Sequence, residues 1–366
     1  MVRLFLRLGF TAFGGPAAHI ALMEDETVTR RGWLTRQQFL DLLGMANLLP
    51  GPTSTEMSIF LAFRRASWAG LLLGGACFIL PAVLLTGLLA WAYLRFGALP
   101  KIASILYGIR PVVVAIVLQA LWRLGRSALK SGFLLAIGAG ALALGLLEVG
   151  PVWILLLSAV LAASAEWGHR WGRSAVAVAA GPWIAGASGA VTLTGVFLVF
   201  LKMGFVVFGS GYTLLAFLRA DLVGRLHWLT ERQLIDAVAV GQFTPGPVFT
   251  TATFIGYLLA GPKGAGVATA AVFAPAFLFV AATGGLLPRL RKSATVGAVL
   301  NGVNAGSLGL IASVGFFLGR SAIIDLPTAL IGVASAVLLL ALRLNPTWLI
   351  LAGAAAGALL GRGVPI

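Results

Sequence analysis

Two stretches of the chain place a Pro-Gly-Pro sequence where an apolar helix is expected, and their backbone could bind an anion. Residues 47–56 read NLLPGPTSTE and residues 242–251 read QFTPGPVFTT. Proline lacks the N–H that a helix interior needs and clashes with the preceding turn, so each helix must end and restart here. A restarting helix presents unpaired N–H groups at the positive end of its dipole, here on residues 53–56 and 248–251. We therefore expect an oxyanion site, although a packing kink is the alternative for either break taken alone.

Candidate anion-binding residues share backbone donors, hydroxyl donors or a positive charge, and they form three groups. The Pro-Gly-Pro breaks contribute Asn47, Pro50, Gly51, Pro52, Thr53, Ser54, Thr55, Gln242, Pro245, Gly246, Pro247, Thr250 and Thr251. Two glycine-rich breaks contribute Phe13, Gly14, Gly15, Gly209, Ser210 and Gly211. Cations inside apolar runs are Arg7, Lys202 and Arg110. A charge within a membrane span costs at least about 2.5 kcal/mol, so it usually serves a ligand, and snorkelling to the headgroups is the alternative.

Three carboxylates are candidates for proton coupling. Glu56 lies one turn into the first restarted helix, where an ionised carboxylate would repel an anionic substrate and a protonated one would not. A structural hydrogen bond, or an ion pair with Arg7 or Arg110, is the alternative for Glu56. Asp41 and Asp236 occupy matching positions after two predicted helix starts, and helix-face pairing with loop cations is the favoured interpretation for both.

The composition requires that these residues be held by a membrane-embedded helical protein. Of the 366 residues, 60% are hydrophobic and only 10% are charged. Apolar runs such as 69–94, 102–121 and 265–287 reach the roughly 20 residues that cross a bilayer core. The formal charge of +15 comes from short basic clusters between apolar runs, which is typical of cytoplasmic loops and not of a nucleic-acid-binding protein. We predict an all-α polytopic membrane protein whose main partner is the lipid bilayer.

Enzyme and cofactor signatures are missing from the sequence. There is no His-Glu-x-x-His zinc motif, no glycine-rich phosphate loop with lysine, and no cysteine or histidine cluster with metal-ligand spacing. The single cysteine, Cys77, excludes a disulfide framework. We therefore expect no metal, no cofactor and no enzymatic activity.

The chain contains an internal duplication. Residues 5–55 and 200–250 are identical at 18 of 51 positions without a gap, at a constant shift of 195. The two repeats are predicted to cover residues 1–168 and 196–366, joined by a linker over 169–195.

Each repeat is predicted to contain broken helices or re-entrant hairpins. Capping boxes start helices at Thr35 and Thr230, and about fourteen residues, or roughly 21 Å, separate Thr35 from Pro50. That length falls short of a hydrocarbon core of about 30 Å. A short helix over 53–63 follows, so the pair forms either a re-entrant hairpin or one discontinuous span. Basic residues on both flanks favour the hairpin.

The orientation of the two repeats depends on how many spans each contains. Further spans near 67–94, 102–122, 132–147 and 151–166 would give about five per half, and an odd number inverts the second copy. Residues 175–193 are apolar enough to form one more span, which would make the halves parallel. We favour inverted repeats.

These motifs, taken together, resemble those of the chromate transporter (CHR) family over nearly the whole chain. The resemblance rests on FGGP at 13–16, RGWLT at 31–35, LPGPTSTE at 49–56, FGSG at 208–211 and QFTPGPVFT at 242–250. It implies a duplicated, inverted-repeat antiporter that exports chromate across the bacterial inner membrane at the expense of the proton gradient. Sulfate, a similar tetrahedral dianion, is the alternative ion, and an uncoupled anion channel is the alternative mechanism. Asn47 departs from the glutamine usual in the family, and the oligomeric state stays open, a homodimer included.

Overall fold

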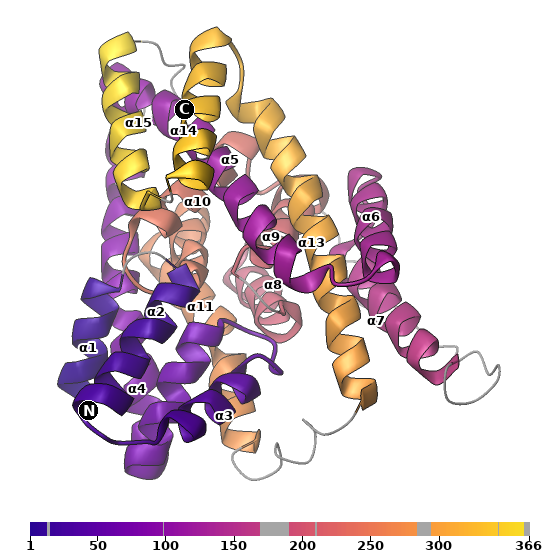
Figure 1. The fold of residues 1–366 in the computed structure, drawn as a ribbon. Coiled ribbons are helices and arrows are strands. Elements are labelled where there is room, and N and C mark those ends of the chain that lie inside the picture. Colours follow the sequence, from indigo (N-terminus) through magenta and orange to yellow (C-terminus); the bar gives the residue numbers. More distant parts are fainter. Residues whose placement is uncertain are drawn as a thin grey trace.

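The fold is helical throughout the part of the chain that the computed structural model describes, residues 1–12, 15–97, 99–168, 190–208, 211–283, 294–342 and 344–361 (Figure 1). The first half contains α1 (Val2–Thr11), α2 (Gly15–Glu24), the π-helical turn η1 (Asp25–Arg30), α3 (Arg36–Ala46), α4 (Thr53–Phe96), α5 (Pro100–Ala128), α6 (Gly132–Leu146) and α7 (Pro151–Gly168). The second half contains α8 (Leu193–Val206), α9 (Thr213–Leu218), η2 (Arg219–Arg225), α10 (Glu231–Phe243), η3 (Val248–Thr250), α11 (Thr251–Thr283), α13 (Ala294–Ala322), α14 (Leu326–Ala341) and α15 (Pro346–Leu360).

Helix α4 consists of two antiparallel segments. The backbone leaves helical geometry at Ala66 and Ser67, where Ser67 has a φ of 48°. After this point the chain doubles back, because a Cβ placed on Gly70 would lie 1.9 Å from the carbonyl oxygen of Ala62. Helix α11 reverses in the same way at Ala260 and Gly261. The short predicted helix and the predicted span after it are therefore separate elements in space.

The first Pro-Gly-Pro break belongs to a re-entrant hairpin. The capping box predicted at Thr35 is present and starts α3. The guanidinium groups of Arg31 and Arg65 lie 5.7 Å and 5.8 Å from the centre of the Trp33 ring. Arg65 ends the first segment of α4, so this segment returns to the side where α3 begins. A single discontinuous span would place these two ends on opposite sides.

The two halves exchange helices. Helices α6 and α7 pack on α13 of the other half, and α14 and α15 pack on α5 (Figure 1). Small residues allow the close approach: a Cβ on Gly309 of α13 would lie 2.4 Å from the carbonyl oxygen of Gly138, and one on Gly357 of α15 would lie 2.2 Å from that of Ser104. Each half thus covers the long helix of the other, and the core is continuous between them.

The chain is a multi-pass membrane protein. Among the described residues, four apolar helices are long enough to cross a bilayer: α4, α5, Val248–Thr283 and Thr295–Ala322. The second segment of α4 exposes Leu72, Leu84 and Leu88 at 59–62%, as expected for a surface in lipid. Helix α6 has 15 residues, or about 22 Å, and is shorter than the core. Most of the candidate extra span at 175–193, residues 175–189, lies outside the described residues, so the orientation of the halves stays a prediction.

Candidate functional site

The breaks in the helices are joined to one another across the two halves of the protein. The Gly51 N–H donates a hydrogen bond of 2.7 Å to the Val207 carbonyl, and the Gly246 N–H donates one of 3.0 Å to the Ala12 carbonyl. Both donors and both acceptors are related by the repeat shift of 195, so the two contacts are reciprocal. Each Pro-Gly-Pro break therefore binds the first broken helix of the opposite half. We call these joined segments the break junction, comprising residues 50–56, 245–251, Ala12 and Val207.

Glycine is required at the centre of each Pro-Gly-Pro break. The φ angles are 134° at Gly51 and 94° at Gly246, a region that residues with a Cβ rarely adopt. Space is also short, since a Cβ on Gly246 would lie 2.9 Å from the Cβ of Ala82 in α4. The break junction depends on these two glycines for both its backbone shape and its packing.

Fewer amide donors are unpaired than the sequence predicts. The N–H groups of Thr55 and Glu56 bond to the Pro52 carbonyl, and that of Thr250 bonds to the Pro247 carbonyl. The expectation that all of residues 53–56 and 248–251 present unpaired N–H groups is therefore wrong, because the first turns tighten onto the preceding prolines. Within the described residues, some N–H groups at the starts of the restarted helices have no backbone acceptor. They include those of Ser54, Val248 and Phe249.

Some hydroxyl groups at the break junction are hydrogen-bonded, and one is not. Thr250 donates its hydroxyl to the Pro247 carbonyl at 2.9 Å, and Thr251 donates to the Val248 carbonyl at 2.8 Å. The Thr55 hydroxyl is buried and has no hydrogen-bond partner among the described residues. Thr55 is therefore the threonine of this set whose hydroxyl is available as a donor.

Glu56 places a carboxyl group inside the break junction. Its side chain is fully buried, and neither carboxyl oxygen has a hydrogen-bond partner in the described part of the chain. The side chain folds back over the break, because Oε1 lies 2.7 Å from the position of a Cβ on Gly51. The ion pair with Arg7 or Arg110 that the sequence left open is not formed, since both cations bind other carboxylates.

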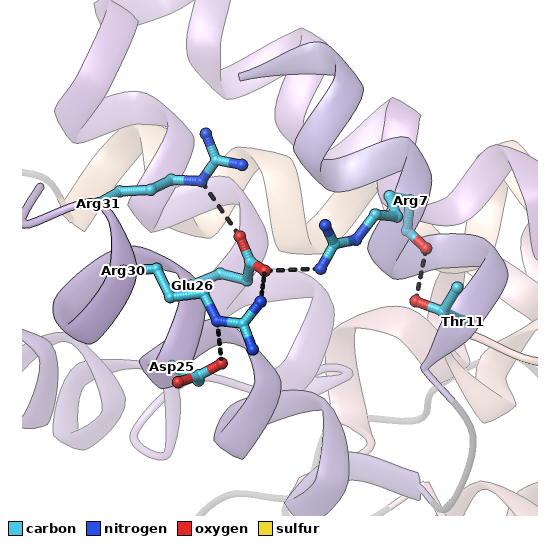
Figure 2. A network of polar contacts seen from close by, with 6 residues as sticks. All are labelled: Arg7, Thr11, Asp25, Glu26, Arg30 and Arg31. Atoms are coloured by element: carbon cyan, nitrogen blue, oxygen red, sulfur yellow. Dashed lines mark hydrogen bonds and ion pairs between the residues drawn. The ribbon is translucent and has the colours of Figure 1, made fainter.

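Arg7 belongs to a network around Glu26, a residue that the sequence reasoning missed (Figure 2). Arg7 contacts Glu26 at 2.6 Å, and Arg30 and Arg31 contact the same carboxylate at 3.4 Å and 3.2 Å. Figure 2 shows the three guanidinium groups approaching Glu26 from different sides, with Arg30 also bound to Asp25. Burial opposes ionisation, but the Arg31 hydrogen bond and the Arg7 and Arg30 charges outweigh it and hold the pKa of Glu26 below its usual value.

The second half repeats this arrangement. Lys202 forms an ion pair with Asp221, and Arg225 contacts the same carboxylate at 3.3 Å. These three residues, Lys202, Asp221 and Arg225, are the copies of Arg7, Glu26 and Arg30 at a shift of 195. The repeated carboxylate beside repeated cations is the sequence signal that could have identified Glu26. Each pair ties the first helix of its half to the helical segment that follows.

Arg110 and Asp236 form a buried ion pair between the halves. Nε and Nη2 of Arg110 each donate a hydrogen bond of 2.9 Å to Asp236, and the Tyr93 hydroxyl donates a third of 2.9 Å. The sequence favoured a loop cation as the partner of Asp236, and the structure places a cation from the middle of α5 there instead. The matching carboxylate Asp41 is half-exposed and accepts a hydrogen bond from Gln37.

The remaining predicted residues lie at the edges of the break junction or beyond the described residues. Gly211 lies beside Val248, and Gly15 begins α2. Asn47 is exposed, whereas its copy Gln242 is half-buried and accepts a long hydrogen bond of 3.5 Å from Tyr212. The positions outside the described residues are Phe13, Gly14, Gly209 and Ser210.

Comparison with known proteins agrees with this architecture. The family model described as chromate transporter matches residues 1–163 and 194–358. The chain belongs to the chromate transporter family. Because the model matches twice, this is a duplicated member of that family. The family consists of transport proteins, so the chain is a transporter and not an enzyme.

Named relatives cover nearly the whole chain. A chromate transport protein of Cupriavidus metallidurans is 34% identical over 97% of this chain and 91% of its own length. A probable chromate transport protein of Synechococcus elongatus is 32% identical over 91% of this chain and 87% of its own length. A chromate transport protein of Pseudomonas aeruginosa is 32% identical over 90% of this chain and 83% of its own length. No solved structure matches the chain.

Proposed function

We propose that this member of the chromate transporter family carries chromate across the bacterial inner membrane, with the anion bound at the break junction. The observation that supports this most is the reciprocal pair of hydrogen bonds from Gly51 and Gly246, which joins each Pro-Gly-Pro break to the first broken helix of the opposite half. Their N-termini offer the N–H groups of Ser54, Val248 and Phe249 and two positive dipole ends. Chromate is proposed because three relatives carry it in their names.

The cationic side chains would contribute little to the electrostatic binding of the anion. Arg7, Lys202 and Arg110 are each paired with a carboxylate, so amide donors and helix dipoles would supply most of the binding. Such a site suits any tetrahedral dianion, and sulfate is the alternative substrate. Selectivity between the two ions would come from the size of the break junction.

Glu56 links the anion to a proton in this proposal. A buried carboxylate without a partner is costly when ionised, and an anion beside it increases the cost. Glu56 would therefore be protonated while chromate is bound, so that both ions move together. One chromate dianion with one proton carries one negative charge, and the membrane potential supplies about 2.3 kcal/mol per 100 mV to move it outward. This coupling differs from the antiport that the family resemblance implies.

Transport in proteoliposomes would test the proposal. We expect chromate flux to rise when the chromate side is acidified at a clamped membrane potential, and sulfate to compete. Acceleration by acid on the opposite side would show antiport. Unitary currents that do not depend on the pH gradient would show an anion channel instead.

A further inference from the structure

An apolar groove whose lining includes no residue of the break junction lies between α5, α6, α13 and α14. It has a volume of about 710 Å³ and is lined by Leu118, Leu121, Trp122, Gly125, Arg126, Leu129, Leu135, Gly138, Ala139, Leu142, Leu308, Gly309, Ala312 and Leu340. A groove of this volume is large enough for part of a small molecule. Arg126 is the charged member of this lining, and all the other lining residues are uncharged.

The groove has a polar end and an apolar end. Along α5 it extends from Leu129, beside Arg126, to Leu118. These eleven residue steps of helix correspond to about 16 Å, close to half of the roughly 30 Å hydrocarbon core. The Arg126 guanidinium lies 5.8 Å from the centre of the Trp122 ring, and both residue types favour the membrane–water interface. The groove therefore has the depth of one leaflet, with the cation at the headgroup level.

The charge around the polar end is positive and unbalanced. Arg123, Arg126 and Lys130 are exposed, and none forms an ion pair within the described residues. Helices α6 and α14, which pack around the groove, carry no charged residue. A negative group at this end would meet Arg126, with Arg123 and Lys130 nearby in the sequence, and no competing carboxylate from the lining.

We propose that this groove binds one anionic phospholipid, with its phosphate on Arg126 and an acyl chain along the apolar lining. Arg123 and Lys130 would add positive potential for the headgroup. A basic pocket between membrane helices is a known type of site for anionic headgroups. The apolar lining alone would accept any lipid chain, so the preference for a negative headgroup rests on Arg126.

The second half provides a matched control. Arg320 is the copy of Arg126, and its guanidinium lies 6.0 Å from the Phe316 ring, as Arg126 lies over Trp122. Arg320 is exposed but does not line the groove. Arg320→Gln therefore removes an equivalent surface charge without touching the proposed lipid site.

Native mass spectrometry of the full-length protein would measure the retention of phosphatidylglycerol against phosphatidylcholine. We expect the wild type to retain phosphatidylglycerol preferentially. Arg126→Gln should reduce this preference about five-fold, the effect of one basic residue near an anionic surface. Ala139→Trp should fill the groove and reduce retention of both lipids, while Arg320→Gln should behave like the wild type.

Several outcomes would overturn the proposal. One is equal retention of the two lipids by the wild type, and another is an unchanged preference in Arg126→Gln. Arg126→Gln replaces an exposed side chain, so its result stands even where Ala139→Trp fails to fold. A dimer that dissociates in Ala139→Trp, with no change in lipid retention, would assign the groove to a second copy of the chain.

Discussion

Arg110 and Asp236 join the two halves of the protein through a buried ion pair with two hydrogen bonds of 2.9 Å. Their side chains are 10% and 1% exposed, so water can replace neither partner. Asp236 belongs to α10, the helix that ends before the second Pro-Gly-Pro break, and Arg110 belongs to the long helix α5 of the first half. The pair therefore holds α10, beside the break junction, in a fixed position against α5.

Removing one partner of this pair should destabilise the protein strongly. Asp236→Asn leaves the Arg110 guanidinium buried without a counter-charge, and we expect a loss of about 3–5 kcal/mol in the free energy of unfolding. Asp25→Asn breaks the exposed pair with Arg30 and should cost at most about 1 kcal/mol. Denaturant unfolding in detergent would compare the two. Equal losses would show that burial does not set the strength of the Arg110 pair.

Gly51→Ala should impair transport by distorting the break junction. The alanine would have to adopt a φ of 134°, and its Cβ would displace the Glu56 carboxyl group from 2.7 Å. Strain of this kind costs about 1–3 kcal/mol. Gly87→Ala is the control, because a Cβ there meets nothing within 4 Å. Chromate flux per folded molecule should fall in Gly51→Ala and stay normal in Gly87→Ala, and normal flux in both would exclude a strict need for glycine at the break.

One ion pair occurs in both halves with its charges exchanged. Glu24 contacts Arg36 at 3.3 Å, and their copies Arg219 and Glu231 contact each other at 2.8 Å. We expect the double exchange E24R/R36E to change stability by less than about 0.5 kcal/mol, since the Arg36 side chain is exposed and that of Glu24 is partly exposed.

The same exchange in the second half should be harmful. Arg219 also contacts Glu148 at 3.2 Å, and its guanidinium lies 3.4 Å from the centre of the Phe317 ring. R219E/E231R would place a carboxylate against Glu148 and remove the cation–π contact, so we expect a loss of about 1–3 kcal/mol. Thermal unfolding of both double variants would show the difference. Equal tolerance in the two halves would mean that the additional contacts of Arg219 do not stabilise the fold.

The Glu26 network should make stability depend on pH. A carboxyl group whose pKa is lowered in the folded state contributes stability above its unfolded pKa of about 4.3 and loses it as the pH falls through the folded value. Glu26→Gln should therefore melt below the wild type at pH 7, and the difference should shrink below about pH 4. A difference in melting temperature that stays constant from pH 7 to pH 3 would show that the Glu26 charge is not involved.

Local features were well predicted from the sequence. The capping boxes at Thr35 and Thr230 are both present, because this signal depends on side chains three residues apart. The ends of helices before Pro50 and Pro245 follow from the missing N–H of proline. The repeat shift of 195 also relates contacts in space, such as those of Gly51 and Gly246. Short-range rules were sufficient for the capping boxes and the helix ends, whereas the reciprocal contacts follow from the repeat.

Long-range contacts were harder to predict from the sequence. The exchange of α6 and α7 onto α13 depends on the fit of small residues such as Gly138 and Gly309, and apolar faces do not specify their partner in the sequence. The Tyr93–Arg110–Asp236 cluster joins positions up to 143 residues apart and has no copy that would reveal it. By contrast, Glu26 and Asp221 could have been found by asking which carboxylates are repeated together with Arg7 and Lys202.

Proton coupling through Glu56 is tested most directly by chromate flux in proteoliposomes containing Glu56→Gln, which keeps the size of the side chain and removes its ionisation. Chromate-for-chromate exchange, which needs no net proton movement, should remain close to the wild-type rate. Chromate flux driven by acid on the chromate side should no longer respond to the pH gradient. If Glu56→Gln keeps the wild-type response to the pH gradient, Glu56 is not the coupling group and the central claim is contradicted.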